Sequence, residues 1–308
     1  FILDPQNAKR VRLNSGGIPV TFTFGTDGRM VSLKGMRVNK KLDVIFPVLH
    51  GTFGEDGTTQ GLLSLANIPC VGPGVEASAI GMDKDVTKRL WRDAGLPIAD
   101  FLVLTPSEAK QWSYKQIKKK LGTPFFIKPA IAGSSVGVHK VESATQFSKA
   151  LNDAFLYSHK VLIETMVRGR EIECSVLGND EIQVSLPGAV IPTYSFYSYE
   201  AKYLDPNGAQ FEIPARMTKS MVRKIQRIVT EAYQVLGLEG MARVDGFLTH
   251  DGQFILNEVN TIPGFTKISM YPKLWEVSGL SYPDLIDRLI QLALERHQRD
   301  QKLKTYRL

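Results

Sequence analysis

Three observations predict a protein of mixed α/β and α+β class. An apolar run at residues 42–49 is followed by a Gly-rich loop and then a helical pattern, which is the repeating unit of an α/β sheet. Further along, short strand-like runs alternate with helical stretches, and residues 241–261 have the pattern of a β-hairpin. With 308 residues, and 43% of them apolar, the chain is long enough to bury the cores of two or three domains.

We expect three domains, over residues 1–83, 84–172 and 173–308. In the first domain, an α/β unit, residues 42–49 are predicted to form a buried strand. The helix that follows this strand is predicted over residues 58–66.

The loop between this strand and helix carries two polar residues of interest, His50 and Glu55. Open α/β sheets bind ligands at the carboxyl ends of their strands, so both side chains stand where a substrate could lie. Alternatively, the polar residues of the loop only cap the next helix. The pattern alone leaves both interpretations open.

The middle domain is predicted to be a small α+β unit, and the last domain to hold a second sheet. The middle domain begins with a helix over residues 84–94. Its predicted strands cover residues 101–104, 125–128, 138–141 and 161–164. The elements predicted for the last domain are an aromatic-rich segment at 194–213, a helix at 218–236, the hairpin at 241–261 and an amphipathic helix at 282–299.

Composition and charge exclude several classes of protein. The net charge of +7 favours an anionic partner such as nucleotide phosphates, although a solvated basic surface explains it equally well. The one tight basic cluster, at residues 118–120, lies in a helical stretch without interleaved aromatic residues, which argues against nucleic-acid binding. Apolar runs fall far short of the ~20 residues that span a bilayer, so no membrane segment is expected. Cys70 and Cys174 are isolated, without the spacing of a redox or metal site, which predicts a reduced, cytoplasmic protein.

The predicted hairpin is the most informative stretch. Its two runs meet at Asp251-Gly252, a strong signal for a two-residue loop. With that loop, Asp245 lies opposite Glu258 and Arg243 lies opposite Asn260, and all four share one face because side chains alternate along a strand. The other face would carry side chains suited to a core, namely Val244, Leu248, Ile255 and Val259.

Two carboxylates directly opposite each other repel, so a positive charge is expected between Asp245 and Glu258. Mg²⁺ is the natural candidate, because it takes oxygen ligands, usually one or two carboxylates together with substrate phosphates. Asn260 adds an amide oxygen two residues beyond Glu258. The alternative is a structural network in which Arg243 neutralises both acids.

A Gly- and Ser-rich loop follows the strand that ends at Lys128. Its backbone N–H groups and hydroxyls could hold phosphate oxygens beside the Lys128 charge, although the loop has no Walker A pattern and an ordinary turn explains it equally well. The loop also matches Gly-x-Ser-x-Gly, the nucleophile elbow of α/β hydrolases, with Ser135 at its centre. An elbow requires a helix directly after the serine, whereas the residues after Ser135 have a strand pattern, so the hydrolase is the weaker hypothesis.

Together, the lysine-bearing strand, the Gly-Ser loop and the acidic hairpin resemble an ATP-grasp fold, in which two domains clamp ATP between their sheets. Within that superfamily the chain closely resembles the D-alanine:D-alanine ligase family over essentially its whole length, which implies a Rossmann-like N-terminal domain before the ATP-grasp domains. The motifs that carry the resemblance are His50-Gly with Gly54-Glu-Asp-Gly57, Met82-Asp-Lys84, Lys128-Pro, Gly133-Ser-Ser-Val-Gly137, Tyr199-Glu-Ala-Lys-Tyr203, Gly240-Met-Ala-Arg-Val-Asp245 and Asn257-Glu-Val-Asn-Thr-Ile-Pro-Gly264.

The resemblance implies an enzyme of peptidoglycan precursor synthesis that joins two D-alanine molecules through an acyl phosphate. Its cofactors would be ATP and Mg²⁺, with two ions bound and Mn²⁺ as a substitute, and the family usually forms homodimers. The implied ATP-binding residues are Lys84, Lys128, Ser135, Glu164, Val167, Glu171, Lys202 and Asn257. The implied metal ligands are Asp245, Glu258 and Asn260, the catalytic residues Arg243, Ser134, Tyr203 and Gly264, and the substrate-binding residues His50, Ser269 and Met270.

The aromatic-rich segment at residues 194–211 has the composition of a lid that keeps water from the acyl phosphate. A plain surface loop is the alternative. In the family, tyrosine at position 203 accompanies an amine acceptor rather than a hydroxyl acceptor such as D-lactate. Another carboxylate–amine ligase with the same fold and a different acceptor remains a third hypothesis.

The family's N-terminal Ser-x-Glu motif, whose glutamate holds the amino group of the first D-alanine, does not occur in this sequence. We expect that the sequence begins downstream of the natural opening strand, because the first αβ layer could hardly stand without it. Gly246 and Lys267 also differ from the side chains usual in the family, and both lie beside predicted site residues.

Overall fold

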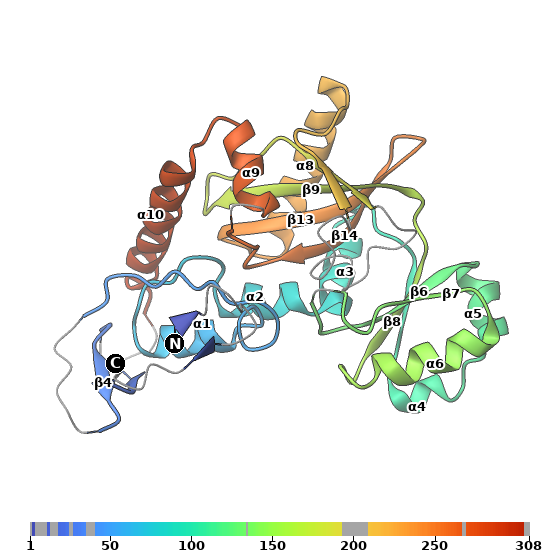
Figure 1. Cartoon of the computed structure of the whole chain (residues 1–308), viewed down its shortest axis with the longest axis horizontal. Helices are drawn as coiled ribbons and strands as arrows, with labels where there is room; N and C mark the ends of the chain where they lie inside the picture. The colour runs from blue at the N-terminus through green and yellow to red at the C-terminus, as the bar shows by residue number, and fades with distance from the viewer. Residues whose placement is uncertain are drawn as a thin grey trace.

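Two antiparallel sheets organise the chain, with helices on their outer faces (Figure 1). The computed structural model describes residues 2–3, 11–12, 18–24, 27–34, 41–133, 135–192, 209–266 and 269–304. The larger sheet runs in the order β12-β11-β9-β13-β14, with β10 paired to β9, and the smaller in the order β5-β8-β6-β7. The chain passes from the small sheet to the large one at residues 166–168, between β8 and β9.

The large sheet is covered differently on its two faces. Its strands are β9 (Gly169–Gly178), β10 (Gln183–Val184), β11 (Gly188–Pro192), β12 (Ala209–Glu212), β13 (Gly240–Thr249) and β14 (Phe254–Asn260). One face packs on α8 (Lys219–Val235), where Val176 and Val244 meet Ile225 and Val229 in the core. The other face is covered at one end only, where Leu177 and Met241 pack under α9 (Met270–Val277) and α10 (Tyr282–Asp300).

The small sheet consists of β5 (Phe101–Leu104), β6 (Phe125–Pro129), β7 (His139–Val141) and β8 (Val161–Thr165). On one face it packs on α4 (Pro106–Ala109), α5 (Tyr114–Leu121) and α6 (Ala144–Ala154). Phe125 and Ile127 are fully buried against these helices, so the alternating Phe126 and Lys128 face the opposite side. All four strands predicted for this region are confirmed, as are the helices at 218–236 and 282–299.

The predicted strand at residues 42–49 is wrong. Only Ile45 pairs there, in an isolated parallel bridge to Cys70, and Val48 and Leu49 are 55% and 49% exposed. The N–H of Ile45 donates to the Pro69 carbonyl, and among the described residues no strand pairs with the other edge of the segment, so no ladder forms. Helix α1 (Thr58–Leu65) lies between the two bridged segments, so the predicted helix after the loop is confirmed although the strand before the loop is not.

The remaining N-terminal elements are short. They are β1 (Ile2–Leu3), β2 (Val11–Arg12), β3 (Val20–Phe22), β4 (Met30–Ser32) and α2 (Val75–Met82). Helix α3 (Lys84–Asp93) follows α2 and leads to the small sheet. The division into domains at residues 83 and 172 stays a prediction.

In the hairpin of β13 and β14, Asp245 lies opposite Glu258 as predicted, but the loop that gives this pairing is not the predicted two-residue loop. The N–H of Thr249 donates to the carbonyl of Gln253, so the loop contains residues 250–252 rather than only Asp251 and Gly252. A bulge between Asp245 and Gly246 then absorbs the one-residue shift and returns Asp245 opposite Glu258. The prediction that Ile255 faces the core is wrong. Because of the shift, Ile255 pairs with Phe247 and is only partly buried, and Phe254 and Leu256 lie in the core instead.

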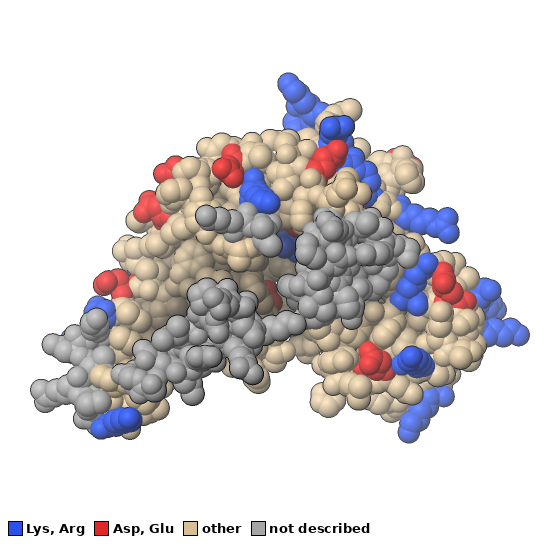
Figure 2. Space-filling view, in the orientation of Figure 1, with Lys and Arg blue, Asp and Glu red and all other residues tan. Residues whose placement is uncertain are grey.

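Charged side chains are dispersed over the surface seen in Figure 2, where Lys and Arg lie over α8 and around the small sheet with Asp and Glu among them. Lys118, Lys119 and Lys120 are exposed on α5, as expected for a solvated helix face. Within the described residues no helix has the length and apolar character needed to cross a membrane.

Candidate active site

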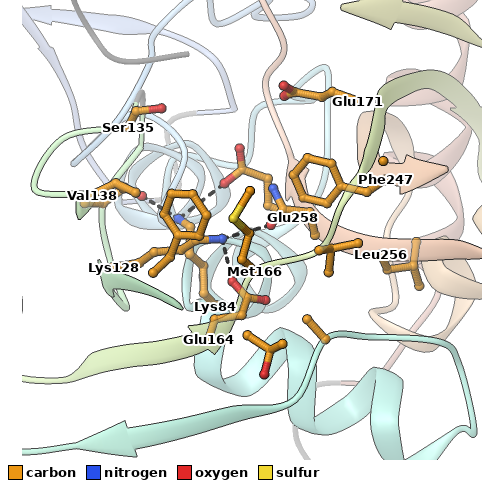
Figure 3. Close-up of a pocket in the computed structure, with 17 residues that line it drawn as sticks. Lys84, Lys128, Ser135, Val138, Glu164, Met166, Glu171, Phe247, Leu256 and Glu258 are labelled. Carbon is orange, nitrogen blue, oxygen red and sulfur yellow. Dashed lines mark hydrogen bonds and ion pairs between the residues drawn. The ribbon is translucent and has the colours of Figure 1, made fainter. Parts of the chain in front are cut away.

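A cavity of about 220 Å³ lies where the open faces of the two sheets meet. Lys128 and Glu164 enter it from the small sheet, and Phe247, Leu256 and Glu258 from the large sheet (Figure 3). Its remaining lining residues are Lys84, Ala99, Phe126, Ala132, Ser135, Val138, Thr165, Met166, Val167, Gly169, Glu171 and Asn257. All the predicted ATP-binding residues that the structure describes therefore line one cavity.

The floor of the cavity holds a buried ion-pair network. Glu164 is 3% exposed, and its carboxylate pairs with Lys88 through one oxygen and with Lys128, at 2.5 Å, through the other. Lys128 also donates to Oδ1 of Asn257 at 3.0 Å, which links the small sheet to β14. Burial alone would raise the pKa of Glu164, but the neighbouring Lys128 and Lys88 outweigh it and hold that pKa below its ordinary value.

Lys84 and the Gly-Ser loop form the next part of the cavity wall. The Lys84 ammonium donates to the Ala132 carbonyl at 2.6 Å and lies 3.6 Å from a carboxylate oxygen of Glu258. Ser135 and Gly137 both have positive φ. The Val138 N–H donates a turn hydrogen bond to the Ser135 carbonyl. A tight turn and then β7 follow Ser135, without the helix that a nucleophile elbow needs, so the hydrolase hypothesis loses its support.

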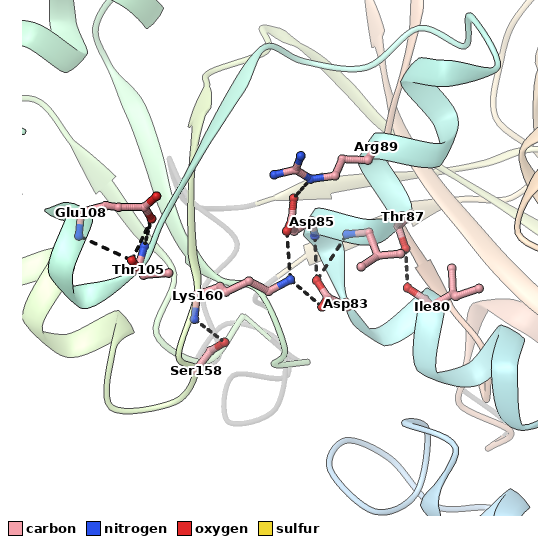
Figure 4. Close-up of polar contacts among 10 residues, drawn as sticks. Ile80, Asp83, Asp85, Thr87, Arg89, Thr105, Glu108, Ser158 and Lys160 are labelled. Carbon is pink, nitrogen blue, oxygen red and sulfur yellow. Dashed lines mark hydrogen bonds and ion pairs between the residues drawn. The ribbon is translucent and has the colours of Figure 1, made fainter.

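Helix α3 carries Lys84 and is fastened to the small sheet at its first turn (Figure 4). Asp83 caps the helix by accepting from the backbone N–H groups of Asp85 and Val86. Lys160, next to β8, donates to carboxylates of Asp83 at 2.8 Å and Asp85 at 2.9 Å. The position of Lys84 relative to the cavity therefore depends on this attachment.

Three carboxylates lie side by side on the uncovered face of the large sheet. Glu173 on β9 pairs with Asp245 on β13, which pairs in turn with Glu258 on β14. Arg243 donates to Asp245 at 2.8 and 2.7 Å and lies 3.1 Å from Glu173, so the predicted alternative of an arginine network holds for Asp245. Asn260 adds a hydrogen bond of 2.9 Å to the same carboxylate.

These residues also fit a divalent cation. No group of three or more His, Cys, Asp or Glu side chains suited to a metal occurs among the described residues, so a complete protein cage is absent there. A pair of facing carboxylates with one amide, beside a cavity lined by lysines, instead matches Mg²⁺, which keeps open positions for water and substrate phosphates.

The predicted substrate-binding residues lie at the covered end of the large sheet and in the N-terminal loop. Nδ1 of His50 donates to the Ile262 carbonyl at 3.1 Å. A Cβ on Gly264 would lie 2.8 Å from Oγ of Ser269, so these two residues are adjacent, and Ser269 accepts from the Thr266 N–H at 3.0 Å. Met270 is 5% exposed, and its side chain lies next to Gly188.

Several predicted residues lie outside the described part of the chain. They are Ser134, Lys202 and Tyr203, the neighbouring Lys267, and residues 193–208 of the predicted lid.

Two residues of the site were not predicted from the sequence, Lys88 and Glu173. Lys88 follows Lys84 by four residues, a spacing that places both on one face of a helix. Glu173 follows Glu171 by two residues, which places both on one face of β9. Both signals are present in the sequence, but each depends on knowing which face is functional.

Comparisons with known proteins agree on one family. A family model described as the D-ala D-ala ligase C-terminus matches residues 90–291, and one described as the D-ala D-ala ligase N-terminus matches residues 20–73. The chain is 50% identical over 308 residues to a D-alanine–D-alanine ligase of Oceanobacillus iheyensis, covering 100% of this chain and 84% of the relative. It is 56% identical over 264 residues to D-alanine–D-alanine ligase A of Escherichia coli strain K12, covering 86% of this chain and 72% of the relative.

Solved structures give the same result. The D-alanine–D-alanine ligase of Coxiella burnetii superposes with a TM-score of 0.82 at 41% identity, covering 92% of this chain and 76% of that one. The VanG D-Ala:D-Ser ligase of Enterococcus faecalis superposes with a TM-score of 0.83 at 36% identity, covering 91% of this chain and 81% of that one. The expected ATP-grasp fold is thereby confirmed, and the chain belongs to the D-alanine–D-alanine ligase family.

Proposed function

We propose that this chain is an ATP-dependent D-alanine:D-alanine ligase that forms D-alanyl-D-alanine, ADP and phosphate through an acyl phosphate. One observation carries the proposal: Lys84 and Lys128 line one cavity together with Glu258, which is the end member of a row of three paired carboxylates on the large sheet. Lysines meet phosphate charge, and carboxylates meet a divalent cation, so the cavity has the two kinds of group that phosphoryl transfer requires.

The nucleotide would lie across the cavity, with its base at the apolar end and its phosphates toward Lys84 and Lys128. Met166 and Phe247 offer apolar surface for adenine, and Glu171 offers a carboxylate to the ribose hydroxyls. Ser135, in the turn beside the lysines, would add donors to the phosphates. Lys202 would approach the same phosphates.

Asp245, Glu258 and Asn260 would hold two Mg²⁺ ions, for which Mn²⁺ could substitute. When bound, the ions screen the repulsion between the nucleotide phosphates and the attacking D-alanine carboxylate. Arg243 already pairs with Asp245 and Glu173, which holds the guanidinium beside the row of carboxylates. Its remaining N–H groups, with the Gly264 N–H, would then stabilise the oxyanion formed when the amine attacks.

The two amino acids would bind on either side of Arg243. His50 would lie near the first D-alanine, and Ser269 and the backbone of Met270 would hold the carboxylate of the second. Tyr203 and Ser134 would complete the enclosure that excludes water, as the sequence predicts. We also infer a homodimer in the cytoplasm, by analogy with the family.

A specific observation supports one alternative acceptor, D-serine, because a D-Ala:D-Ser ligase is among the similar structures. Phosphate release should be measured with D-alanine alone, and with D-alanine plus D-serine, D-lactate or L-alanine, each with product identification by mass spectrometry. D-alanine alone should support the fastest turnover. A mixed dipeptide with D-serine, or an ester with D-lactate as main product near neutral pH, would overturn the choice of acceptor.

A further inference from the structure

Lys88 is a buried cation for which the proposed mechanism has no use. It lies on α3, one helical turn after Lys84, and its side chain is 1% exposed. It is not among the residues that line the cavity, so its ammonium cannot touch a nucleotide there. Burying an ammonium group is costly unless it is paired, and Glu164 is the carboxylate that pairs with it.

The pairing has a consequence for Lys128. Glu164 divides its two oxygens between Lys88 and Lys128, so the three groups together carry one net positive charge. Lys128 is 14% exposed and lines the cavity, so it is the member of the three that can present this charge to a ligand. Without Lys88, the Glu164 carboxylate would neutralise Lys128 completely.

We propose that Lys88 is a positioning residue for ATP, which holds Glu164 and thereby leaves the charge of Lys128 available to the nucleotide phosphates. This inference rests on the proposed nucleotide site. It concerns only the phosphate part of the ligand, because adenine and ribose carry no charge for Lys128 to meet. Burial lowers the pKa of Lys88, and Glu164, with a smaller contribution from Glu258, opposes this effect.

Substitutions that change the net charge of the three groups test the proposal. The dissociation constants of ATP and of adenosine should be measured on the full chain by calorimetry. In Lys88→Met, where the net charge is zero, the constant for ATP should rise about tenfold or more while that for adenosine changes by less than about twofold. Lys88→Arg should bind ATP nearly as the natural protein does.

The double variant Lys88→Met/Glu164→Gln separates charge from packing. It restores a net charge of +1, so its ratio of ATP to adenosine affinity should return toward that of the natural protein. Glu164→Gln alone, with a net charge of +2, should give the highest ratio. If the single Lys88→Met variant does not fold, comparison of Lys88→Met/Glu164→Gln with Glu164→Gln still measures the effect of Lys88.

Two results would overturn the role of Lys88. One is an equal loss of ATP and adenosine affinity in Lys88→Met, which would indicate a general collapse of the cavity floor. The other is a ratio that does not follow net charge across the natural protein and its four variants. If the natural protein binds neither ATP nor adenosine, the nucleotide site itself is wrong, which is a different failure.

Discussion

At the scale of single residues, Asp245 connects several residues of the candidate site. It is 2% exposed, it accepts two hydrogen bonds from Arg243 and one from Asn260, and it lies opposite Glu258. An acid so placed both fixes the arginine and offers an oxygen to a cation. Its removal should therefore affect catalysis far more than it affects folding.

Asp245→Asn and Glu258→Gln should each reduce phosphate release by about 100-fold or more, because charge stabilisation in the transition state is lost. Both variants keep the shape of the side chain, so the thermal midpoint should stay within a few degrees. Asp251→Asn is the matched control, since Asp251 is an exposed carboxylate in the loop of the same hairpin. Full activity in both site variants would remove the basis for the metal site.

A second residue-scale prediction concerns Glu55 and pH. Burial raises the pKa of Glu55, although the Gly51 N–H, at 2.5 Å, and the charge of His50 oppose this. A carboxyl group with a raised pKa in the folded state favours folding while it is protonated. That contribution is lost as the pH rises from the ordinary carboxyl pKa through the raised value.

Glu55→Gln stays neutral at every pH, and its amide oxygen can still accept from Gly51. The variant should therefore gain free energy of unfolding relative to the natural protein as the pH rises from the ordinary carboxyl pKa through the raised pKa of Glu55. Urea unfolding at several pH values measures this difference. Glu76→Gln, on the exposed side of α2, is the control, and a Glu55→Gln effect that is flat with pH would refute the prediction.

At the scale of elements, the bulge in the β13–β14 hairpin places the site residues, and Gly246 permits it. A Cβ on Gly246 would lie 2.6 Å from the Phe254 ring and 2.7 Å from the Ile255 carbonyl. Phe254 is fully buried, so neither neighbour can move away easily. Gly246→Ala should lower the free energy of unfolding by about 1 to 3 kcal/mol.

The control for this substitution is Gly61→Ala, in the middle of α1. No heavy atom lies within 4 Å of a Cβ there, so this variant should be neutral or more stable by about 0.5 to 1 kcal/mol, because alanine favours a helix. Denaturant unfolding of both variants compares the two sites. Equal stability of Gly246→Ala and the natural protein would mean that the bulge relaxes without cost.

The same hairpin explains which features could be predicted from the sequence. The pairing of Asp245 with Glu258 was predicted correctly because a longer loop and a bulge shift the register in opposite directions. A bulge leaves no mark in hydrophobic periodicity, so Ile255 was assigned to the wrong face. Strands of the small sheet were predictable because β5 and β6 both pair with β8, which lies between them, and because β6 buries alternate residues. Residues 42–49 are similarly apolar, but within the described part of the chain no strand pairs with one of their edges, and no local sequence pattern contains this property of the tertiary structure.

Another element-scale prediction concerns the attachment of α3 to the small sheet (Figure 4). Lys160 joins Asp83 and Asp85 with hydrogen bonds of 2.8 and 2.9 Å, while its own side chain is 29% exposed. Lys160→Met should lower the free energy of unfolding by about 1 kcal/mol, since two partly buried carboxylates lose their common partner. It should also weaken ATP binding, because α3 carries Lys84. Lys149→Met, exposed on α6, should change neither property.

At the scale of the whole molecule, two backbone connections between the described parts of the two sheets lie beside the cavity. The residues between β8 and β9 pass from one to the other, and the Leu256 N–H of β14 donates to the Pro97 carbonyl, ahead of β5, at 2.8 Å. The cavity itself takes its lysines from α3 and β6 and its carboxylates from β8, β9 and β14. A ligand that fills the cavity would therefore add contacts between the small sheet and the large sheet.

ATP with Mg²⁺ should consequently link the stability of the two sheets. If the ligand binds only when both are folded, a concentration of about 100 times the dissociation constant stabilises both by about 2.7 kcal/mol. Hydrogen exchange of backbone amides in β6 and in β13 measures this separately for each sheet. Hydrogen exchange of both sets of amides should slow by a similar factor with ATP and Mg²⁺. It should slow less with adenosine, which lacks the phosphates that the lysines and the metal ions would bind. Protection confined to one sheet would mean that the nucleotide does not bridge them, and the placement of its phosphates between Lys128 and Asp245 would then be wrong.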